Sequence, residues 1–403
     1  MSQQALAGVK VVEFADFVCG PYCGKLLADF GAEVIKVEKP GLGDKSRRWG
    51  PFPQDIPHAE KSGLFIFLNS NKLGLTLDVE TAAGLKIMKE LLNQADVLIE
   101  DKLPVEAARL GLNYEALHKS NSKLAVTSIT PFGQTGPFRD YKGNDLIGSH
   151  SGAEAFGNPD EGVKDLENEP PLKGSYHVTD ISTGITAAVL TLAAVVAQKK
   201  SGIGQHIDLS QQEAVASTGR QQLAYYAVQG LTPSREWGRK KFGGFLYPCL
   251  DGYVVIWIGP HYPRVMNMLG NPEWSKEEMF ANPLLRNDYI VELNQLISTW
   301  TIEHTGEEIN QLAIEHGVPC SLVRSVKDLV NDEQLAFRQY WEEIEHPIAG
   351  KIKFPGRPFR LSQTPGIIER PAPMLGEHNE KIICQRLGYS RKDLVRMRQG
   401  GII

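Results

Sequence analysis

The sequence predicts an α/β protein in which a large domain is built on a doubly wound parallel sheet and a smaller lobe is α/β or α+β. Strand-like apolar runs alternate with helix-like segments over the first third of the chain, and the composition shifts near residue 230. Such alternation is typical of βαβ units. We expect a large domain over 1–225, a small domain over 230–330, and a return segment over 331–403 that completes the large domain.

The N-terminal segment has the pattern of a first βαβ unit. Residues 9–14 (VKVVEF) form a short apolar run, and Gly20-Pro21 marks the turn into a segment with helical periodicity. Residues 34–37 predict the second strand. The turn lacks the G-x-G-x-x-G pattern that places a dinucleotide pyrophosphate on a helix N-terminus, so NAD-dependent chemistry is disfavoured.

The same pattern then repeats along the chain. Residues 73–79 and 96–100 predict strands, with an amphipathic helix over 81–95 between them. A helix around 114–119 precedes a further strand over 123–130. These elements together predict a largely parallel sheet covered by helices on both faces.

The middle of the chain contains a long polar connection. Residues 131–175 are rich in Gly, Pro, Asp, Asn and Glu, and compact domains tolerate such connections mainly where they have a function. A strongly apolar helix is expected over 183–199, a short strand over 207–209, and another helix over 211–228.

The small lobe is expected to begin with a buried strand, YVVIWIG from Tyr253, followed by several short helices through Gly317. The rest of the chain is punctuated by Pro and Gly until a last helix around 380–387.

Composition and charge exclude several classes of function. The 43 Lys and Arg residues and 48 Asp and Glu residues give a net charge of −5, which disfavours nucleic acid as a partner. The longest apolar stretch, 185–197, is shorter than the ~20 residues that span a bilayer, and the N-terminus lacks a signal-peptide pattern. We therefore expect a cytoplasmic protein without a membrane partner.

Neither the cysteines nor common motifs indicate a metal or a nucleotide loop. The five cysteines are scattered, which suits a reducing compartment. Cys19 and Cys23 lie one helical turn apart without further ligands at metal spacing, so we expect no metal. Phosphate-loop, nucleophile-elbow and H-E-x-x-H patterns are absent from the sequence.

Asp180 stands out because it precedes the apolar helix, with Ser182, Thr183 and Gly184 expected in the first turn. Asp is favoured at helix starts by capping and by the helix dipole, which gives a structural interpretation. The functional interpretation is a partly buried carboxylate that is fixed as a nucleophile. The residues alone leave both interpretations open.

Separated segments along essentially the whole chain share one resemblance. They are LAGVKVVEFADFVCGP, GAEVIKVEKPGLGD, LNSNKLGLTLD, GLNYEAL, FGQTGPFRD, SGIGQHIDLS, HGVPCSLV, HPIAGKI and PAPMLGEHNE. With these segments the chain resembles the family III CoA-transferases, the group of formyl-CoA:oxalate, carnitine, bile-acid and benzylsuccinate CoA-transferases. The related α-methylacyl-CoA racemases share the resemblance.

The resemblance implies that Asp180, in the family's D-x-x-x-G segment, is the catalytic carboxylate. A CoA-transferase must keep the energy of the thioester while it exchanges acids, and both an acyl anhydride and a CoA thioester on Asp do so. The implied function is transfer of CoA from an acyl-CoA, such as succinyl-CoA, to a free carboxylic acid through these two intermediates.

The resemblance also implies further site residues. Gly243 and Gly244 correspond to a glycine loop over the active site whose backbone N–H groups would stabilise an oxyanion, although a simple turn explains them equally well. The implied cofactor is coenzyme A as a substrate, and the candidate contacts to it are Lys39, Lys72, Arg109 and Lys142.

The sequence departs from the family pattern at two places. EDKLPV at 100–105 stands where ENFxPG is usual, so the resemblance does not extend to that stretch of the CoA contact. Val18 stands where the formyl-CoA transferases have a glutamine, so we expect an acceptor larger and more apolar than oxalate.

Alternative functions remain open. The racemases carry a His in a GHDxxY segment and a Glu before a Pro, but here Gly143 or Asn144 and Gly259 stand at those positions. A CoA-thioester hydrolase, or one subunit of a heteromeric transferase, is also possible. The resemblance implies an interlocked dimer, expected here as a homodimer or as a heteromer with a homologous subunit.

Overall fold

The computed structural model describes the chain except residues 1–3, 159–164, 166–167, 233–234 and 236–245. The chain forms two compact units. The first unit contains Met1–Glu154, Gly174–Thr218 and Ala336–Ile403, and the second contains Ala155–Lys173 and Gly219–Leu335.

The first unit is built on a six-stranded sheet in the order β3-β2-β1-β4-β5-β6. The strands are β1 Lys10–Phe14, β2 Glu33–Glu38, β3 Leu73–Thr76, β4 Val97–Glu100, β5 Ala125–Thr130 and β6 His206–Ser210. Every neighbouring pair is parallel, and the strand order reverses between β1 and β4. The predicted doubly wound α/β fold is therefore confirmed, and its topological switch point lies at the carboxyl ends of β1 and β4.

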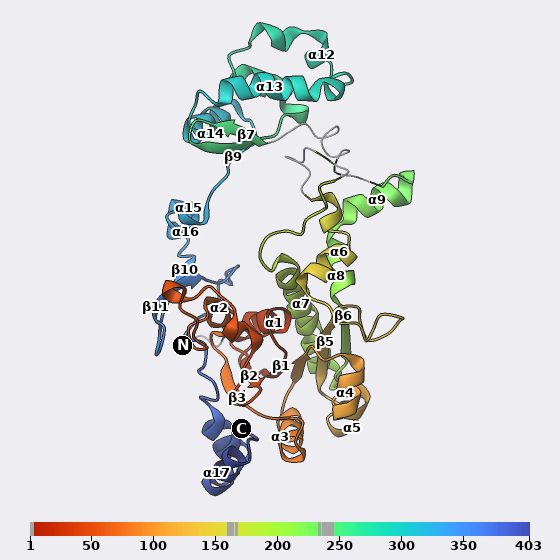
Figure 1. The fold of residues 1–403 in the computed structure, drawn as a ribbon, viewed down its shortest axis with the longest axis vertical. Coiled ribbons are helices and arrows are strands. Elements are labelled where there is room, and N and C mark those ends of the chain that lie inside the picture. Colours follow the sequence, from red (N-terminus) through yellow and green to blue (C-terminus); the bar gives the residue numbers. More distant parts are fainter. Residues whose placement is uncertain (1–3, 159–164, 166–167, 233–234, 236–245) are drawn as a thin grey trace. The chain divides into compact units, whose positions relative to one another are not determined.

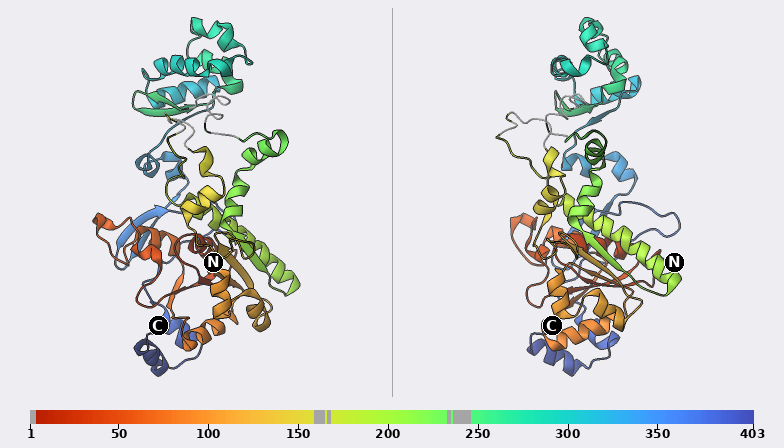
Figure 2. Two further views of the ribbon diagram at one scale, coloured as in Figure 1. Left: turned by 45° about the vertical axis from the view of Figure 1, so that its right-hand side comes forward. Right: turned by 90° about the vertical axis from the view of Figure 1, so that its right-hand side faces the viewer.

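Helices cover both faces of this sheet (Figures 1 and 2). One core cluster joins the sheet to α3, α4, α5, a π-helix and α17, and the other joins it to α1, α7 and α8. The bounds are α1 Cys19–Asp29, α3 Ala82–Leu92, α4 Pro104–Leu110, α5 Tyr114–Ser120, α7 Val178–Ser201, α8 Gln211–Thr218, the π-helix Glu380–Arg386 and α17 Arg391–Gln399.

Helix α7 is the element that carries Asp180, and it begins earlier than the expected range of 183–199. By length and composition it could span a membrane. Ala187 and Ala194 belong to the core cluster beneath α1, whereas Ile185, Val189 and Val196 on the same helix are exposed. Gly184 lies where α7 crosses α1, and a Cβ there would lie 2.8 Å from the carbonyl oxygen of Cys19.

The C-terminal segment returns to the first unit. Strands β10 (Trp341–His346) and β11 (Gly350–Pro355) form an antiparallel hairpin beside α2 (Gly63–Asn69), as Figure 1 shows. This hairpin was not predicted. Helix α6 (Asp145–Ser151) also lies within the connection that we expected to be irregular.

The second unit has a three-stranded antiparallel sheet in the order β7-β8-β9, with helices packed on it. This is an α+β arrangement. Strand β8 covers the start of the predicted YVVIWIG segment, but only Val254 and Ile256 in it are buried, so the expectation of a buried strand was wrong. The expected helix over 211–228 is divided at Gly219 into α8 and α9. The remaining bounds are β7 Leu246–Cys249, β8 Gly252–Ile256, β9 Cys320–Leu322, α9 Arg220–Gln229, α11 Tyr262–Met268, α12 Glu278–Ala281, α13 Ile290–Thr301, α14 Gly306–His316, α15 Val326–Val330 and α16 Glu333–Phe337.

Candidate active site

Asp180 lies inside the first turn of α7, two residues after Val178, with its side chain buried. The expectation that it precedes the helix was wrong. Its backbone N–H donates to Oδ1 of Asp145 over 3.0 Å, so a carboxylate from α6 satisfies this amide at the start of α7. The side chain of Asp180 points to other partners, which leaves its capping interpretation without support.

Two donors converge on one oxygen of the Asp180 carboxylate. Gln211 Nε2 lies 2.7 Å from Oδ1, and Cys19 Sγ lies 3.3 Å from the same atom. Gln211 begins α8 directly after β6, and Cys19 begins α1. Both donors to the candidate nucleophile are therefore positioned at the starts of helices that follow strands of the sheet.

The second oxygen, Oδ2, faces His177. His177 Nδ1 lies 3.3 Å from Oδ2, and no Lys or Arg of the described residues forms an ion pair with Asp180. The imidazole is packed edge-on against the rings of Phe17, at 4.9 Å between centroids, and Trp49, at 5.9 Å. Aromatic packing thus restrains the imidazole that faces this oxygen.

The thiol of Cys19 is a hydrogen-bond donor rather than a second nucleophile. Burial and the neighbouring Asp180 charge raise the pKa of the Cys19 thiol well above its usual range. The thiol is therefore protonated at neutral pH and available to donate its S–H to Asp180.

Asp145, His177 and Asp180 each bring one potential metal ligand within 4.8 Å of the others. Asp145 Oδ1 already accepts the Asp180 amide, and Asp180 Oδ1 accepts two side-chain donors. These hydrogen bonds account for one oxygen of each carboxylate, and we assign no metal to the group.

A pocket of about 210 Å³ opens at the carboxyl ends of the strands near the switch point. It is lined by segments 14–16, 37–39, 43–44 and 77–80 together with Lys102 and Glu106. In open α/β sheets, ligands bind in the crevice at this position.

The segment from Ala15 to Cys19 connects this pocket to Asp180. Ala15 and Asp16 line the pocket, Phe17 packs on His177, and Cys19 bonds to Asp180. Phe17 adopts a positive φ of 70°, a conformation that costs a non-glycine residue ~1–3 kcal/mol. Its amide donates to Oδ1 of Asp44 over 3.1 Å, which helps to hold the turn.

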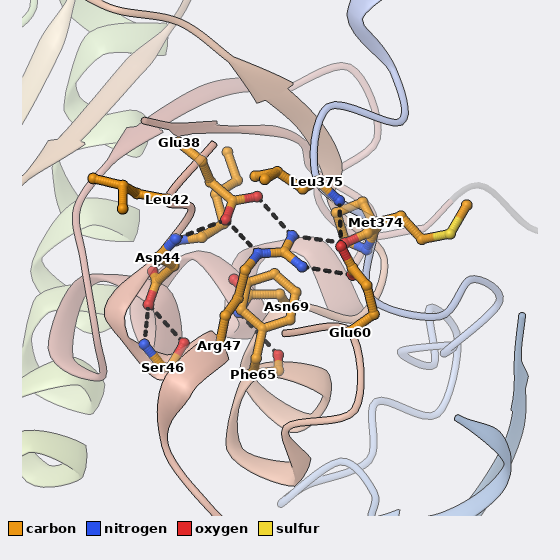
Figure 3. Close-up of polar contacts among 12 residues, drawn as sticks. Glu38, Leu42, Asp44, Ser46, Arg47, Glu60, Phe65, Asn69, Met374 and Leu375 are labelled. Atoms are coloured by element: carbon orange, nitrogen blue, oxygen red, sulfur yellow. Dashed lines mark hydrogen bonds and ion pairs between the residues drawn. The ribbon is translucent and has the colours of Figure 1, made fainter. Parts of the chain in front are cut away.

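Buried ion pairs form the wall behind the pocket. Figure 3 shows the guanidinium of Arg47 between the carboxylates of Glu38 and Glu60, each at 2.7 Å from a guanidinium nitrogen. Asp44 pairs with Lys36 at 2.6 Å, and this cation lowers the pKa of Asp44 to about 2 despite burial. These contacts fix the strand ends that line the pocket.

The residues expected to bind CoA have different positions. Lys39 is exposed and lines the pocket, and Arg109 pairs with Glu80 at the same pocket through two contacts of 2.6 Å. Lys142 is exposed in the connection before α6. Gly243 and Gly244 lie outside the described residues.

Lys72 is placed differently from the other three cations. Its side chain is 1% exposed, and its ammonium lies 2.7 Å from Glu13 Oε2 and donates to the carbonyl of Pro21. A buried and partnered ammonium is not available to a phosphate, so this position favours a structural role for Lys72.

Sequence reasoning identified Asp180 but not its partners Asp145, His177, Gln211 and Cys19 as site residues. Cys19 was considered only as a possible metal ligand, and Gln211 only as the first residue of an expected helix. Their contacts join α1, α6, α7 and α8, which are distant in the sequence. Only the Asn-Asp pair that starts α6 gave a local signal, because Asn144 is a helix N-cap.

The family model and the relatives that this chain matches belong to the same protein family. The chain matches the model of CoA-transferase family III over residues 6–379. It is 32% identical to a succinyl-CoA–D-citramalate CoA-transferase of Chloroflexus aurantiacus, covering 99% of this chain and 98% of the relative. It is also 32% identical to a succinate–glutarate CoA-transferase of Agrobacterium fabrum, covering 94% of this chain and 95% of that relative.

A solved structure agrees with these relatives. A CAIB/BAIF family protein from Brucella suis has a TM-score of 0.82 and 27% identity, covering 95% of this chain and 99% of that chain. The fold, the family match and the two relatives thus point the same way. The chain belongs to CoA-transferase family III and is a transferase.

Proposed function

We propose that this protein moves CoA from an acyl-CoA, with succinyl-CoA as the donor, to a free carboxylic acid, and that Asp180 carries the covalent intermediates. The observation that carries the proposal is the Asp180 carboxylate, 5% exposed, with Oδ1 held by Gln211 and Cys19. No described Lys or Arg pairs with this carboxylate, so its electrons remain available for attack on a carbonyl.

The names of two relatives support the choice of substrates. One acts on succinyl-CoA and D-citramalate, and the other on succinate and glutarate. Both pairs consist of dicarboxylic acids larger than oxalate. Val18, which stands where the formyl-CoA transferases have a glutamine, also favours an acceptor larger than oxalate.

We place the nucleotide end of CoA at the pocket near the switch point. Lys39 lines this pocket and Arg109 pairs with the lining residue Glu80, and both are proposed contacts for the phosphates. The pantetheine arm would follow the segment from Ala15 to Cys19 toward Asp180. Lys142 and the Gly243-Gly244 loop remain proposed contacts, whereas Lys72 is left out because its ammonium is buried.

The assembly and compartment are proposals as well. We propose a homodimer, which a sedimentation measurement that reports a monomer would contradict. All five cysteines are free, which supports a reducing compartment and hence the cytoplasm.

The test is an exchange assay with the purified chain alone. Succinyl-CoA is offered with a panel of dicarboxylic, branched and aromatic acids, and new CoA thioesters are identified by mass. We expect a new thioester with at least one acid, and none with the Asp180→Asn variant.

Other outcomes would replace the proposal. Release of CoA without any new thioester indicates a hydrolase. Deuterium uptake from solvent at the α-carbon of a 2-methylacyl-CoA, without transfer, indicates a racemase. Activity that requires a second polypeptide indicates a heteromeric enzyme.

A further inference from the structure

The two oxygens of the Asp180 carboxylate have different surroundings. Oδ1 faces two side-chain donors, Gln211 Nε2 at 2.7 Å and Cys19 Sγ at 3.3 Å. Oδ2 faces the imidazole of His177 at 3.3 Å. A carboxylate in such an asymmetric site reacts through one oxygen and retains the other.

We propose that Gln211, with Cys19 beside it, forms an oxyanion site for Oδ1 of Asp180, and that Oδ2 is the oxygen that bonds to the acyl carbon. This inference rests on the proposed function. It adds to that function two hydrogen-bond donors to Oδ1 and a fate for each carboxylate oxygen.

The electron flow shows where charge develops. Attack of Oδ2 on the acyl carbonyl expels CoA thiolate and leaves a mixed anhydride in which Oδ1 is a carbonyl oxygen. The thiolate then adds to Cγ of Asp180, and the electron pair of the carbonyl moves onto Oδ1.

Collapse of this tetrahedral species breaks the bond between Cγ and Oδ2. Oδ2 leaves with the donor acid as part of its carboxylate, and Oδ1 remains as the carbonyl oxygen of the aspartyl-CoA thioester. The acceptor carboxylate next adds to the same Cγ, so Oδ1 carries negative charge again.

Donors at Oδ1 therefore have opposite effects on the two halves of the reaction. They withdraw electron density from the free carboxylate, which slows attack by Oδ2. They stabilise the charge that forms on Oδ1 when a nucleophile adds to Cγ, and preorganised donors at 2.7–3.1 Å are effective for this. The distance of 2.7 Å from Gln211 meets that condition.

The amide of Gln211 is held in place before any substrate binds. Its side chain is 4% exposed and occupies space that Gly148 of α6 leaves free. A Cβ at Gly148 would lie 2.6 Å from Cδ of Gln211. Gly148→Ala thus displaces the amide without removing it, whereas Gln211→Met removes the donor at similar volume.

The chain offers a matched control on the same helix. Gln212 donates to the carbonyl of Ser151 over 3.0 Å and makes no contact with Asp180. Gln212→Met changes the neighbouring glutamine in the same way and should leave the covalent chemistry as in the natural chain.

The experiment is a rapid-quench incubation of each full-length protein with succinyl-CoA and no acceptor. Mass spectrometry of the acid-quenched protein separates the acyl anhydride from the CoA thioester by the different masses that the acyl group and CoA add. Hydroxylamine converts both adducts to the same hydroxamate, which then locates them at Asp180. We expect Gln211→Met to form the thioester about 100-fold more slowly, with acylation unchanged or faster, so that the anhydride accumulates.

Gly148→Ala should shift the ratio of the two adducts in the same direction, and Gln212→Met should not shift it. Thermal unfolding of each variant identifies any loss of folding. If the natural chain forms adducts on Asp180 and both Gln211→Met and Gly148→Ala keep its ratio, this inference is wrong and the proposed function stands. If the natural chain forms no adduct on Asp180, the proposed function itself fails.

Discussion

Asp145 and Asp180 are two buried carboxylates that lie side by side and have different tasks. Asp145 accepts a hydrogen bond from the backbone amide of Asp180 at the start of α7. The side chain of Asp180 accepts hydrogen bonds from Gln211 and Cys19. The carboxylate of Asp145 is therefore held by a backbone amide of α7. The carboxylate of Asp180 has no such task and is the one that we expect to react.

Asp145→Ala should therefore lower both stability and turnover. The α7 amide loses its acceptor, which costs ~1 kcal/mol, and the carboxylate of Asp180 loses its fixed position. Asp145→Asn keeps an acceptor oxygen and should retain most of both properties. Thermal unfolding and kcat would be compared, and equal behaviour of the two variants would exclude this hydrogen bond as the positioning contact.

Glu100, at the end of β4, gives a prediction for pH. Burial raises the pKa of its carboxyl to about 7, although a bond from the Lys102 amide opposes this. In the unfolded chain the carboxyl of Glu100 ionises near pH 4.5, so the folded state binds this proton more tightly than the unfolded state. The contribution of Glu100 to stability is then fully present below about pH 4.5 and is lost as the pH rises through 7.

Glu100→Gln removes this titration. The free energy of unfolding of the natural chain should fall by ~3 kcal/mol more than that of Glu100→Gln between pH 4.5 and pH 8, so the variant becomes the more stable protein relative to the natural chain as the pH rises. Urea unfolding of both proteins at the two pH values measures the difference. A difference that is independent of pH would show that Glu100 is ionised in the folded state near pH 5.

At the scale of elements, the parallel sheet could be predicted because its strands contain short apolar runs that alternate with helical segments such as the amphipathic α3. The seven-residue α6 was missed because its sequence, DLIGSHS, has too few apolar residues for a helical period. The hairpin of β10 and β11 alternates charged residues within a Pro-rich stretch, which masked it.

The site shows the same division. Asp180 was found because it stands in the D-x-x-x-G segment of the family. His177 lies three residues before it at the start of the same helix. The partners Cys19, Asp145 and Gln211 come from α1, α6 and α8. A contact such as that of Gln211 with Asp180 depends on where β6 places the start of α8, and that is a property of the assembled sheet.

The close crossing of α1 and α7 depends on the absence of a side chain at Gly184. A Cβ at Gly184 would meet the carbonyl oxygen of Cys19 at 2.8 Å, and a backbone atom in a helix cannot move alone. Gly184→Ala should separate the helices, cost ~1–3 kcal/mol, and reduce kcat, because Cys19 and Asp180 lie on these helices.

The control for this crossing is Ile185→Ala on the exposed side of α7, which should change neither property appreciably. Denaturant unfolding and steady-state kinetics provide the measurements. Full activity in the Gly184 variant would mean that the donor from α1 is not needed at Oδ1.

At the scale of the whole molecule, the C-terminal segment completes the first unit instead of forming a separate body. Arg47 joins the two ends of that unit, because it pairs with Glu38 and Glu60 and donates to the carbonyl of Pro373 (Figure 3). Its side chain is fully buried against the ring of Phe65.

Arg47→Met should destabilise the protein strongly. Removal of one partner leaves buried carboxylates unpaired, which costs ~3–5 kcal/mol. Arg48→Met, at the exposed neighbouring residue, should cost little. Chemical denaturation, together with limited proteolysis of the C-terminal segment, measures both effects, and similar stability of the two variants would contradict this role for the ion pairs.

The central claim is that Asp180 is the residue that becomes acylated, and covalent trapping tests it most directly. The full chain is incubated with its acyl-CoA donor in the absence of an acceptor, treated with hydroxylamine and digested. The account predicts a hydroxamate on Asp180, within the peptide that contains residues 176–185, and none in the Asp180→Asn variant, which also lacks transfer. A hydroxamate on another carboxylate, or near-normal transfer by Asp180→Asn, would contradict it.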